Sequence, residues 1–256
     1  MKKSKKITGV IVLLIILTGI VTYNVNTNIR RAVKAAESCA GINPSVLTYK
    51  VFIFGIIPAG TATIKEAEEP FMGKPSYHVR AEFASADFLN FIFSAKACLD
   101  SYLDKKSFNP VVFRQKTSLK GKPDAYKEVI YDQDKLTMTI DNEVRAILPN
   151  TQDPLSAIFN IRRMDFDVVQ EYDLNLNTNQ KNYMIKGTAS KIMPAGKNAG
   201  AVISLSAEIK RRDKNNPYHK SKLTMYLYRV GNTYYPVLIK VFASGFVITA
   251  RLICAQ

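Results

Sequence analysis

The chain contains no tryptophan, only three cysteines and only two histidines among its 256 residues. Three cysteines, at Cys39, Cys98 and Cys254, are too few for the disulfide framework that holds small secreted domains together. They form no CxxC motif and no metal-binding spacing with the histidines, so neither a zinc site nor a redox motif is indicated. In an oxidising compartment Cys98 is able to pair with Cys254, and buried free thiols are the alternative.

Signatures of catalysis are also missing. His78 lies in a strand-like run and His219 follows a Pro-Tyr pair, and neither belongs to a GxSxG or HExxH pattern. Asp165 and Asp167 form a lone carboxylate pair, which gives no acid–base assignment by itself. The 12 glycines are spread among turns and form no phosphate-binding loop. The sequence therefore predicts a non-catalytic protein without cofactor or metal, with an enzyme acting on envelope polymers as a minor alternative.

Acidic residues are few in comparison with basic ones. Lysine and arginine number 36 against 21 aspartates and glutamates, which gives a formal net charge of +15. Such an excess attracts polyanions, among them anionic lipid headgroups, acidic polysaccharides and nucleic acids. The basic residues are scattered and no nucleic-acid-binding motif surrounds them, so nucleic acid is not an expected partner. A well-solvated basic surface is the plainer interpretation of the charge.

One long uncharged stretch lies near the N-terminus. No charged residue occurs between Lys6 and Arg30, and residues 7–23 are mostly apolar. A run of this kind behind several lysines fits either a membrane-spanning helix or a signal peptide. No pair of small residues follows the run closely enough for signal cleavage, which favours an uncleaved anchor. The lysines before the run predict a cytoplasmic N-terminus and an exported domain.

These features predict three parts. Residues 1–27 form a cytoplasmic tip and transmembrane anchor, or a signal peptide; residues 28–43 form a helical stalk; residues 44–256 form the exported β domain. The expected location is the bacterial inner membrane, crossed once, with the domain in the periplasm. Secretion to the periplasm after signal cleavage is the alternative. The membrane is therefore an expected partner through the N-terminal helix.

Beyond the stalk, the hydropathy pattern alternates with period two, as in half-buried antiparallel strands. Leu136, Met138 and Ile140, for example, alternate with threonines. Turn signals separate about a dozen such runs, and the short connections predict that neighbouring strands pair as a meander. The run Ser85–Phe93 interrupts the pattern and fits a short helix capped by its serine. The expected fold is mainly β: a single curved antiparallel meander sheet, half-barrel or barrel-like.

A second interruption predicts one short helix after residue 152. Asp153 is a good N-cap, and Pro154 suits the first helical position. Leu155, Phe159 and Arg162 then share one face of that helix. Because a lone helix among many strands most often packs into the concave side of a curled sheet, we expect the sheet to wrap around it.

Three short segments resemble a known family. They are Leu47-Thr48-Tyr49-Lys50-Val51 leading to Ile57-Pro58-Ala59-Gly60, Asp153-Pro154-Leu155-Ser156-Ala157 running on to Ile161-Arg162, and Tyr235-Pro236-Val237. Their order and spacing resemble the bacterial family catalogued as domain of unknown function 3108. The resemblance implies an exported envelope protein of antiparallel β structure, distantly similar to half-barrels that carry lipoproteins or lipids. Members usually enter the envelope on a signal peptide, from which an uncleaved anchor would depart. The family has no established catalytic residues to carry over.

A binding role follows from the expected curvature. One short helix leaves part of the concave face of a curled sheet for an apolar cleft that takes an acyl chain, unless side chains fill it completely. The expected ligand contacts are Leu155 and Phe159, with Arg162 or Arg163 meeting an anionic headgroup. The predicted function is a membrane-tethered envelope protein that binds a lipid, or another apolar or anionic ligand such as an acidic envelope polymer. The alternative is a structural or assembly factor that docks another envelope protein.

Overall fold

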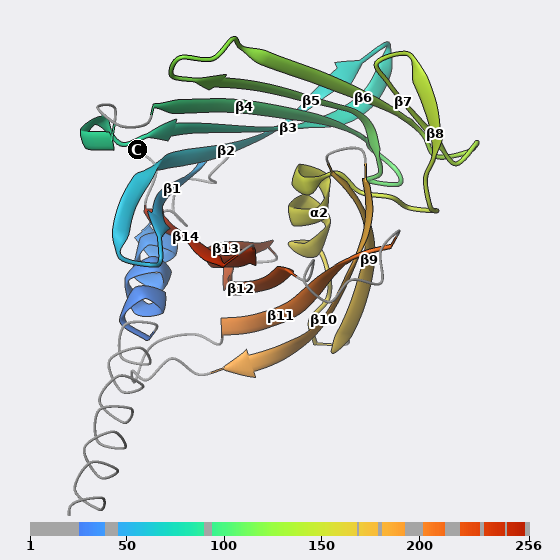
Figure 1. Cartoon of the computed structure of the whole chain (residues 1–256). Helices are drawn as coiled ribbons and strands as arrows, with labels where there is room; N and C mark the ends of the chain where they lie inside the picture. The colour runs from blue at the N-terminus through green and yellow to red at the C-terminus, as the bar shows by residue number, and fades with distance from the viewer. Residues whose placement is uncertain are drawn as a thin grey trace, which may run out of the picture.

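The structure is a computed structural model that describes residues 26–38, 46–89, 94–167, 169–178, 181–192, 202–212, 221–230, 233–243 and 245–253. Within these residues, fourteen strands form a single antiparallel sheet that curves around one helix and is not closed (Figure 1). The mainly β architecture predicted from the period-two pattern is thereby confirmed.

The elements follow one another in two runs of strands separated by the helix. The first run is β1 (Val46–Ile53), β2 (Ile57–Phe71), β3 (Lys74–Ser85), the 3-10 turn η1 (Asp87–Leu89), β4 (Ala95–Asp104), β5 (Pro110–Leu119), β6 (Ala125–Asp132), β7 (Thr137–Ile140) and β8 (Glu143–Ala146). The second run is α2 (Pro154–Ile161), β9 (Glu171–Thr178), β10 (Lys181–Ile192), β11 (Val202–Arg211), β12 (Ser221–Val230), β13 (Thr233–Ala243) and β14 (Phe246–Ile253).

Strand pairing is local in each run. Every strand from β1 to β8 pairs with the next, and so does every strand from β9 to β14, which confirms the predicted meander in both halves. One long-range ladder joins the halves: β1 pairs with β14, with Thr48 opposite Ile253. The outer strands are consequently β8 and β9. Residue Gln152, between β8 and α2, forms an isolated parallel bridge with Leu176 and so covers part of the β9 edge.

Helix α2 lies inside the curve of the sheet and belongs to two packing clusters (Figure 1). Leu155 and Phe159 pack with buried side chains of β3 to β7, such as Phe113. On the other side, Ala157 and Ile161 pack with buried side chains of β9 to β13. The helix therefore links the two halves of the sheet through apolar contacts, the main source of stability in such a core.

Residues 26–38 form a helix that packs against the sheet. Its buried side chains recur at helical spacing: Ile29, Ala32, Val33 and Ala36. Asn28 accepts a hydrogen bond from Arg251 at 2.6 Å, and Glu37 accepts one from Tyr228 at 2.9 Å. Tyr228 alternates along β12 with Leu227, which packs in the cluster around Ala157 and Ile161 of α2, so this helix contacts the opposite face of the sheet there. Residues 28–38 of the expected stalk are thus helical and pack against the sheet, while residues 39–43 lie outside the described part of the chain.

Among the described residues, no helix has the length and hydropathy needed to cross a membrane. The predicted transmembrane segment falls on residues 1–25, which lie outside the described part of the chain. The anchor and its orientation therefore stay predictions.

The helix expected over Ser85–Phe93 can be compared with the structure only as far as Leu89, because residues 90–93 lie outside the described part of the chain. Ser85 is the last residue of β3, and its hydroxyl accepts a hydrogen bond from the amide of Ala95 on β4 at 3.1 Å. Only the 3-10 turn η1 follows among the described residues. The serine was predicted to cap a helix because its own local sequence allows it, but the cross-strand contact uses the hydroxyl instead.

Gly60 lies where β2 is sandwiched closely between β1 and β3. A Cβ atom at this position would lie 2.9 Å from the Phe83 ring and from Ser85 Cα, and closer still to the Ala84 carbonyl oxygen. Replacing Gly60 with alanine is therefore expected to lower the free energy of unfolding by about 2 kcal/mol through overpacking. Urea denaturation would measure the loss, with the exposed neighbour substitution Thr61→Ala as control. Equal stability of both variants would contradict the close approach.

Candidate functional site

The predicted apolar contact residues lie in the core. Leu155 is 5% exposed and Phe159 is 1% exposed, and both pack between α2 and the strands around it. Because α2 fills the concave side at this point, their face of the helix is covered by the sheet. The positions of Leu155 and Phe159 thus agree with the alternative that side chains fill the concave face of the sheet at this point.

Arg162 is buried at the C-terminal end of α2 and bonded to two parts of the sheet. Its Nε donates to the carbonyl oxygen of Tyr234 on β13 at 2.9 Å, and its Nη1 donates to the carboxylate of Glu66 on β2. The guanidinium also lies 5.2 Å from the ring centre of Tyr235. Burial lowers the pKa of Arg162 from its ordinary value. Since β2 and β13 lie on either side of the β1–β14 pair, Arg162 ties the helix to the join between the two halves.

Arg163 has a different environment, although it is the next residue. It is exposed, and its guanidinium lies 3.4 Å from the ring centre of Phe159, with Tyr77 and Phe108 at 5.4 and 5.6 Å. Cation–π contacts of this kind favour a planar guanidinium over an aromatic cluster. Arg163 is therefore the only one of the four predicted contact residues that is exposed to solvent.

Asp153 fixes the other end of α2. Its carboxylate accepts hydrogen bonds from the amides of Leu155 and Ser156 at 2.7 and 3.0 Å, and from the hydroxyl of Ser101 on β4 at 2.5 Å. The Ser156 hydroxyl accepts a hydrogen bond from the amide of Asp153 at 2.8 Å. This contact completes a capping box and confirms the predicted N-cap. Burial raises the pKa of Asp153, and these hydrogen bonds oppose that rise. Both ends of α2 are thus held by polar contacts.

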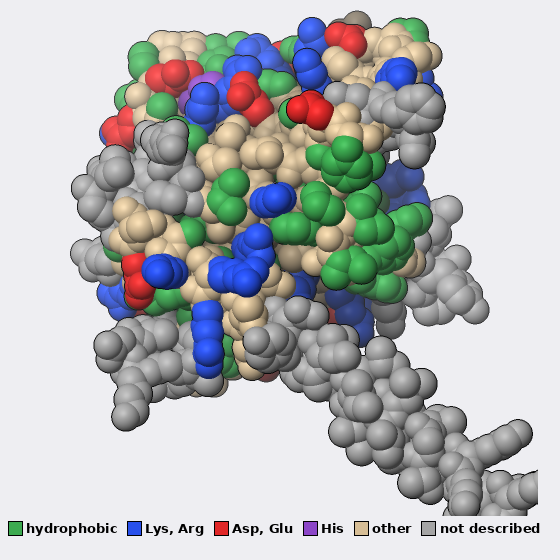
Figure 2. Space-filling view, turned by 90° about the vertical axis from the view of Figure 1, so that its left-hand side faces the viewer, with side chains coloured by type: hydrophobic (Ala, Val, Ile, Leu, Met, Phe, Trp, Pro, Cys, Tyr) green, Lys and Arg blue, Asp and Glu red, His purple; other side chains and the backbone are tan. Residues whose placement is uncertain are grey.

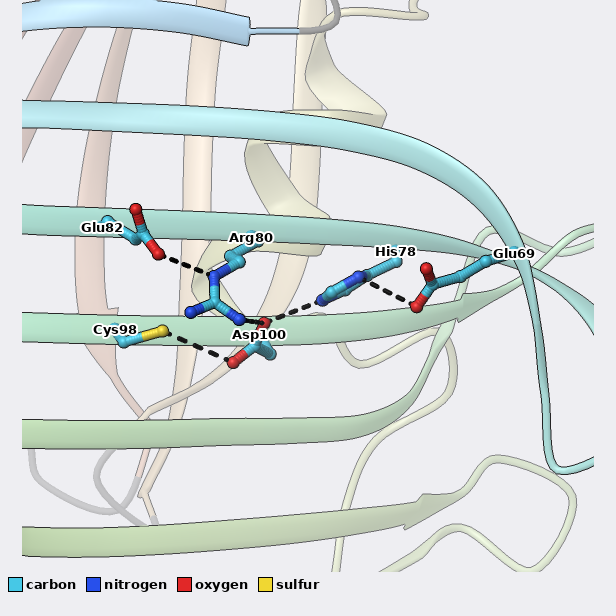
Figure 3. A network of polar contacts seen from close by, with 6 residues as sticks. All are labelled: Glu69, His78, Arg80, Glu82, Cys98 and Asp100. Carbon is cyan, nitrogen blue, oxygen red and sulfur yellow. Dashed lines mark hydrogen bonds and ion pairs between the residues drawn. The ribbon is translucent and has the colours of Figure 1, made fainter.

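A polar network covers the face of β3 and β4 that points away from α2 (Figure 3). Val79 is buried in the core and Ser101 bonds to the helix cap, so these two residues point inward. The residues that alternate with them point outward, among them His78 and Arg80 on β3 and Asp100 on β4. The network therefore lies on the convex face of the sheet, separate from the predicted site at α2.

Asp100 is the centre of the network. Its Oδ1 lies 2.8 Å from Nε2 of His78 and accepts a longer bond of 3.4 Å from Arg80. Its Oδ2 accepts a weak bond from the thiol of Cys98 at 3.6 Å. Arg80 also donates its Nε to Glu82 at 2.9 Å, and these contacts raise its pKa. Three side chains, those of His78, Arg80 and Cys98, thus share the Asp100 carboxylate across two strands.

His78 is held in a fixed ring orientation. Its Nδ1 lies 3.0 Å from the carboxylate of Glu69, so both ring nitrogens face carboxylates. The ring stacks on Tyr102 at 4.4 Å, and Tyr102 stacks in turn on Phe71 at 4.0 Å. A histidine whose two ring nitrogens already contact carboxylates is poorly placed to move a proton to a substrate.

Cys98 lacks the surroundings of a nucleophilic thiol. Burial and the neighbouring Asp100 raise the pKa of Cys98, whereas reactive thiols have a lowered pKa and lie beside a cation or a histidine base. Here Asp100 separates the thiol from His78. Cys98 is a free thiol, while Cys39 and Cys254 lie outside the described residues, so the predicted pairing stays untested.

Metal ligation is not indicated by the described part of the chain. Its His, Cys, Asp and Glu side chains form no group of three or more placed to hold a metal ion. The second histidine, His219, lies outside the described residues.

Beside the network lies a hollow of about 470 Å³ on the convex face of β2 to β5. Its lining residues are Thr61, Thr63, Glu82, Phe83, Ala84, Lys96, Ala97, Cys98, Lys116 and Ser118. Cross-strand pairing of Lys96 with Ser118 and of Cys98 with Lys116 brings the residues of β4 and β5 together. Two lysines therefore border the hollow, hydroxyl-bearing and small side chains form most of the remaining lining, and the carboxylate of Glu82 in the lining is paired with Arg80 at 2.9 Å.

The family assignment rests on a match over most of the chain. The family model described as protein of unknown function (DUF3108) matches residues 48–249. This chain belongs to that family. The match includes all three segments on which the resemblance was based, apart from the first residue of one. Among curated proteins, no match to this DUF3108 chain was found.

One solved structure has a fold similar to that of this DUF3108 chain. The crystal structure of a β-barrel-like protein of domain of unknown function DUF1849 from Brucella abortus is 11% identical, with a TM-score of 0.56. The alignment covers 82% of this chain and 95% of that one. A DUF1329 family protein from Desulfovibrio piger is 10% identical over 88% and 90% of the two chains, but its TM-score is only 0.22. The first similarity supports a barrel-like fold, and the second supports no argument.

Proposed function

We propose that this protein is a non-catalytic envelope protein, tethered to the membrane by its N-terminal segment, that binds an acidic, hydroxyl-rich envelope polymer. The observation that carries the proposal is the hollow on the convex face of β2 to β5. A ligand with carboxylates and hydroxyls would meet groups of matching chemistry there. The proposal keeps the anionic ligand expected from the sequence and moves its site from α2 to the outer face.

The lining of the hollow supports an anionic ligand. Lys96 and Lys116 supply positive charge from neighbouring strands, Lys116 being paired with the exposed Asp124 at 3.3 Å, and three further lining residues, Thr61, Thr63 and Ser118, supply hydroxyl groups. Lysine is a point charge that pairs with a carboxylate or phosphate, and hydroxyls both donate to and accept from sugar hydroxyls. The formal charge of +15 raises the local concentration of any polyanion. An acyl chain on the concave side has less support, because α2 packs there.

A binding role is better supported than catalysis at this site. The thiol of Cys98 has a raised pKa, and the carboxylates of Glu69 and Asp100 hold His78 away from it. These contacts fix the outward-pointing side chains next to the hollow and leave no activated nucleophile among them. Preorganised side chains of this kind lower the entropic cost of binding.

The alternative, a factor that docks another envelope protein, is favoured by the outer strand β8. Val144 on this strand is 68% exposed. The outer edge of β8 is not paired with another strand of the sheet, so a strand of a partner protein could add there. However, β8 is only four residues long and carries Glu143 and Arg145, which are the features that discourage edge pairing. The hollow is therefore the stronger basis for a function.

Charge reversal in the hollow tests the proposal. The double variant Lys96→Glu/Lys116→Glu is expected to bind polygalacturonate at least about tenfold more weakly than the natural chain, because two carboxylates would then face the polymer. Isothermal titration calorimetry at fixed ionic strength would measure the difference.

The matched control is Lys74→Glu/Lys106→Glu, which changes the net charge equally at two exposed positions outside the hollow, the first residue of β3 and the turn after β4. The control is expected to retain most of the affinity. Equal losses in both double variants would show attraction by overall charge alone, and a natural chain that binds no acidic polymer would refute the proposed ligand class.

A further inference from the structure

A group of large apolar side chains is exposed where two turns of the sheet meet. We call it the apolar rim, and its members are Phe54, Ile56 and Ile57 at the β1–β2 turn and Phe242, Phe246 and Ile248 at the β13–β14 turn. Each is between 43% and 73% exposed. Figure 2 shows the side on which the β1–β2 turn lies, with hydrophobic side chains gathered beside lysines and arginines.

The two turns form one surface. Phe54 stacks on Phe246 with ring centres 5.7 Å apart, and the amide of Phe54 donates to the carbonyl oxygen of Val247 at 2.7 Å. Ile53 is paired with Ile248 across the β1–β14 ladder. Contiguous exposed apolar surface on a soluble domain usually marks a contact with a protein or a membrane.

The backbone at the tip of the rim is strained. Phe54 has a φ angle of 53°, in the left-handed region that bulky residues rarely adopt. Its ring is half exposed, so burial within the domain does little to offset that cost. A large ring held outward on a strained turn is consistent with a role in contact with something outside the domain.

Basic side chains lie next to the rim. Lys50 and Arg251 lie 6.0 and 5.2 Å from the ring centre of Phe52. Phe52 lies on β1, two residues before Phe54. No acidic residue occurs between Glu37 and Glu66, or anywhere after Asp213. Both turns, the strands β1, β13 and β14, and β2 as far as Lys65 are therefore free of carboxylates. Aromatic and aliphatic tips flanked by cations match an anionic lipid surface, whose headgroups attract cations and whose acyl boundary accepts apolar side chains.

The chain enters the described structure beside the same basic side chains. Arg251 donates a hydrogen bond to Asn28, close to the start of the helix over residues 26–38. The apolar residues 7–23 end only a few positions earlier in the sequence. A segment held in a membrane at residues 7–23 would therefore bring this side of the domain near the lipid surface.

We infer that the apolar rim, together with Lys50 and Arg251, inserts into the anionic lipid surface that holds the N-terminal segment. This inference rests on the proposed tether and adds an orientation to it. The domain contacts the membrane through the β1–β2 and β13–β14 turns, so the sheet is held at a fixed angle to the bilayer.

The absence of tryptophan gives a direct test. Single tryptophans are introduced into the full chain at Phe54→Trp or Phe246→Trp, with Tyr126→Trp as matched control, since Tyr126 is 65% exposed on the distant strand β6. Each variant is reconstituted into phosphatidylglycerol-containing vesicles with and without brominated acyl chains. Bromine is expected to reduce the emission of the rim tryptophans about twofold and to leave the control unchanged, because quenching needs contact with the acyl boundary.

The outcomes separate this inference from the tether. If the chain floats with the vesicles while the rim tryptophans are not quenched, the tether stands and the rim contact is refuted. A blue-shifted emission without quenching would show that protein covers the rim, which also refutes the lipid contact. If the chain does not float at all, both fail. Replacing phosphatidylglycerol with phosphatidylcholine is expected to weaken the quenching, since Lys50 and Arg251 lose their anionic partners.

Discussion

Replacing Arg162 with methionine is expected to lower the free energy of unfolding by about 3 kcal/mol, because it leaves a half-buried carboxylate without its partner. Glu66 has only 23% of its side chain exposed, and the Tyr234 carbonyl oxygen also loses its donor. Methionine keeps most of the volume of the arginine, so a cavity contributes little to the loss. Chemical denaturation followed by circular dichroism would measure it.

A double-mutant cycle with Glu66→Gln separates the ion pair from simple packing. Glu66→Gln removes the unpaired charge, so the double variant is expected to be more stable than Arg162→Met alone. Arg163→Met is the matched control: its exposed cation–π contacts are expected to contribute about 1 kcal/mol or less. Equal losses for Arg162→Met and Arg163→Met would contradict the anchoring role of Arg162.

Replacing Asp153 with alanine is also expected to lower the free energy of unfolding, by about 3 kcal/mol. The substitution removes an N-cap, for which losses are about 1 kcal/mol, and leaves the buried Ser101 hydroxyl and two helix amides without an acceptor. Asp153→Asn keeps an oxygen in the same place, so its loss at neutral pH is expected to be much smaller. Urea denaturation of both variants would measure the two losses, and equal losses would contradict the account of the cap.

The difference in stability between the natural chain and Asp153→Asn is expected to depend on pH with a defined sign. Burial raises the folded-state pKa of Asp153 above its ordinary value of 3.8, so the folded protein holds this proton more tightly than the unfolded chain does. The resulting stabilisation is complete below the unfolded pKa and is lost as the pH rises through the folded pKa. The natural chain should therefore lose stability relative to Asp153→Asn as the pH is raised from about 4. Parallel stability curves of the two proteins would contradict the raised pKa.

Local sequence patterns predicted most of the elements. Alternation of apolar and polar residues depends only on near neighbours, so runs such as Thr137–Ile140 were identified as strands. Asp153 and Pro154 predicted the start of α2 for the same reason, since a cap and a first-turn proline act within a few residues. These elements could be predicted because the interactions that decide them lie within one turn or one strand.

Long-range pairing could not be predicted in this way. Thr48 pairs with Ile253 across almost the whole chain, and nothing near either residue specifies the other. The run Tyr234–Leu238 is buried without alternation because both faces of β13 are covered, by the core around α2 and by the cluster that includes the helix over residues 26–38. The apolar stripe of that helix was visible in the sequence, but its target was not.

The candidate site shows the same limit. Helical periodicity placed Arg162 on one face with Phe159, which suggested a headgroup contact, but it contained no information about Glu66 on a distant strand. Lys96 and Lys116 are 20 positions apart and are brought to one hollow only by the register of β4 and β5. Arg163 is exposed, and its predicted headgroup contact stays a prediction.

The central claim is that α2 is part of the core and not a movable cover over a ligand cleft. Hydrogen–deuterium exchange of the full chain, followed by mass spectrometry of peptides that contain residues 154–161, tests it most directly. The account predicts that these amides exchange as slowly as those of the central strands β12 and β13, because both ends of α2 are bonded to the sheet. Rapid exchange of α2 while those strands stay protected would contradict it.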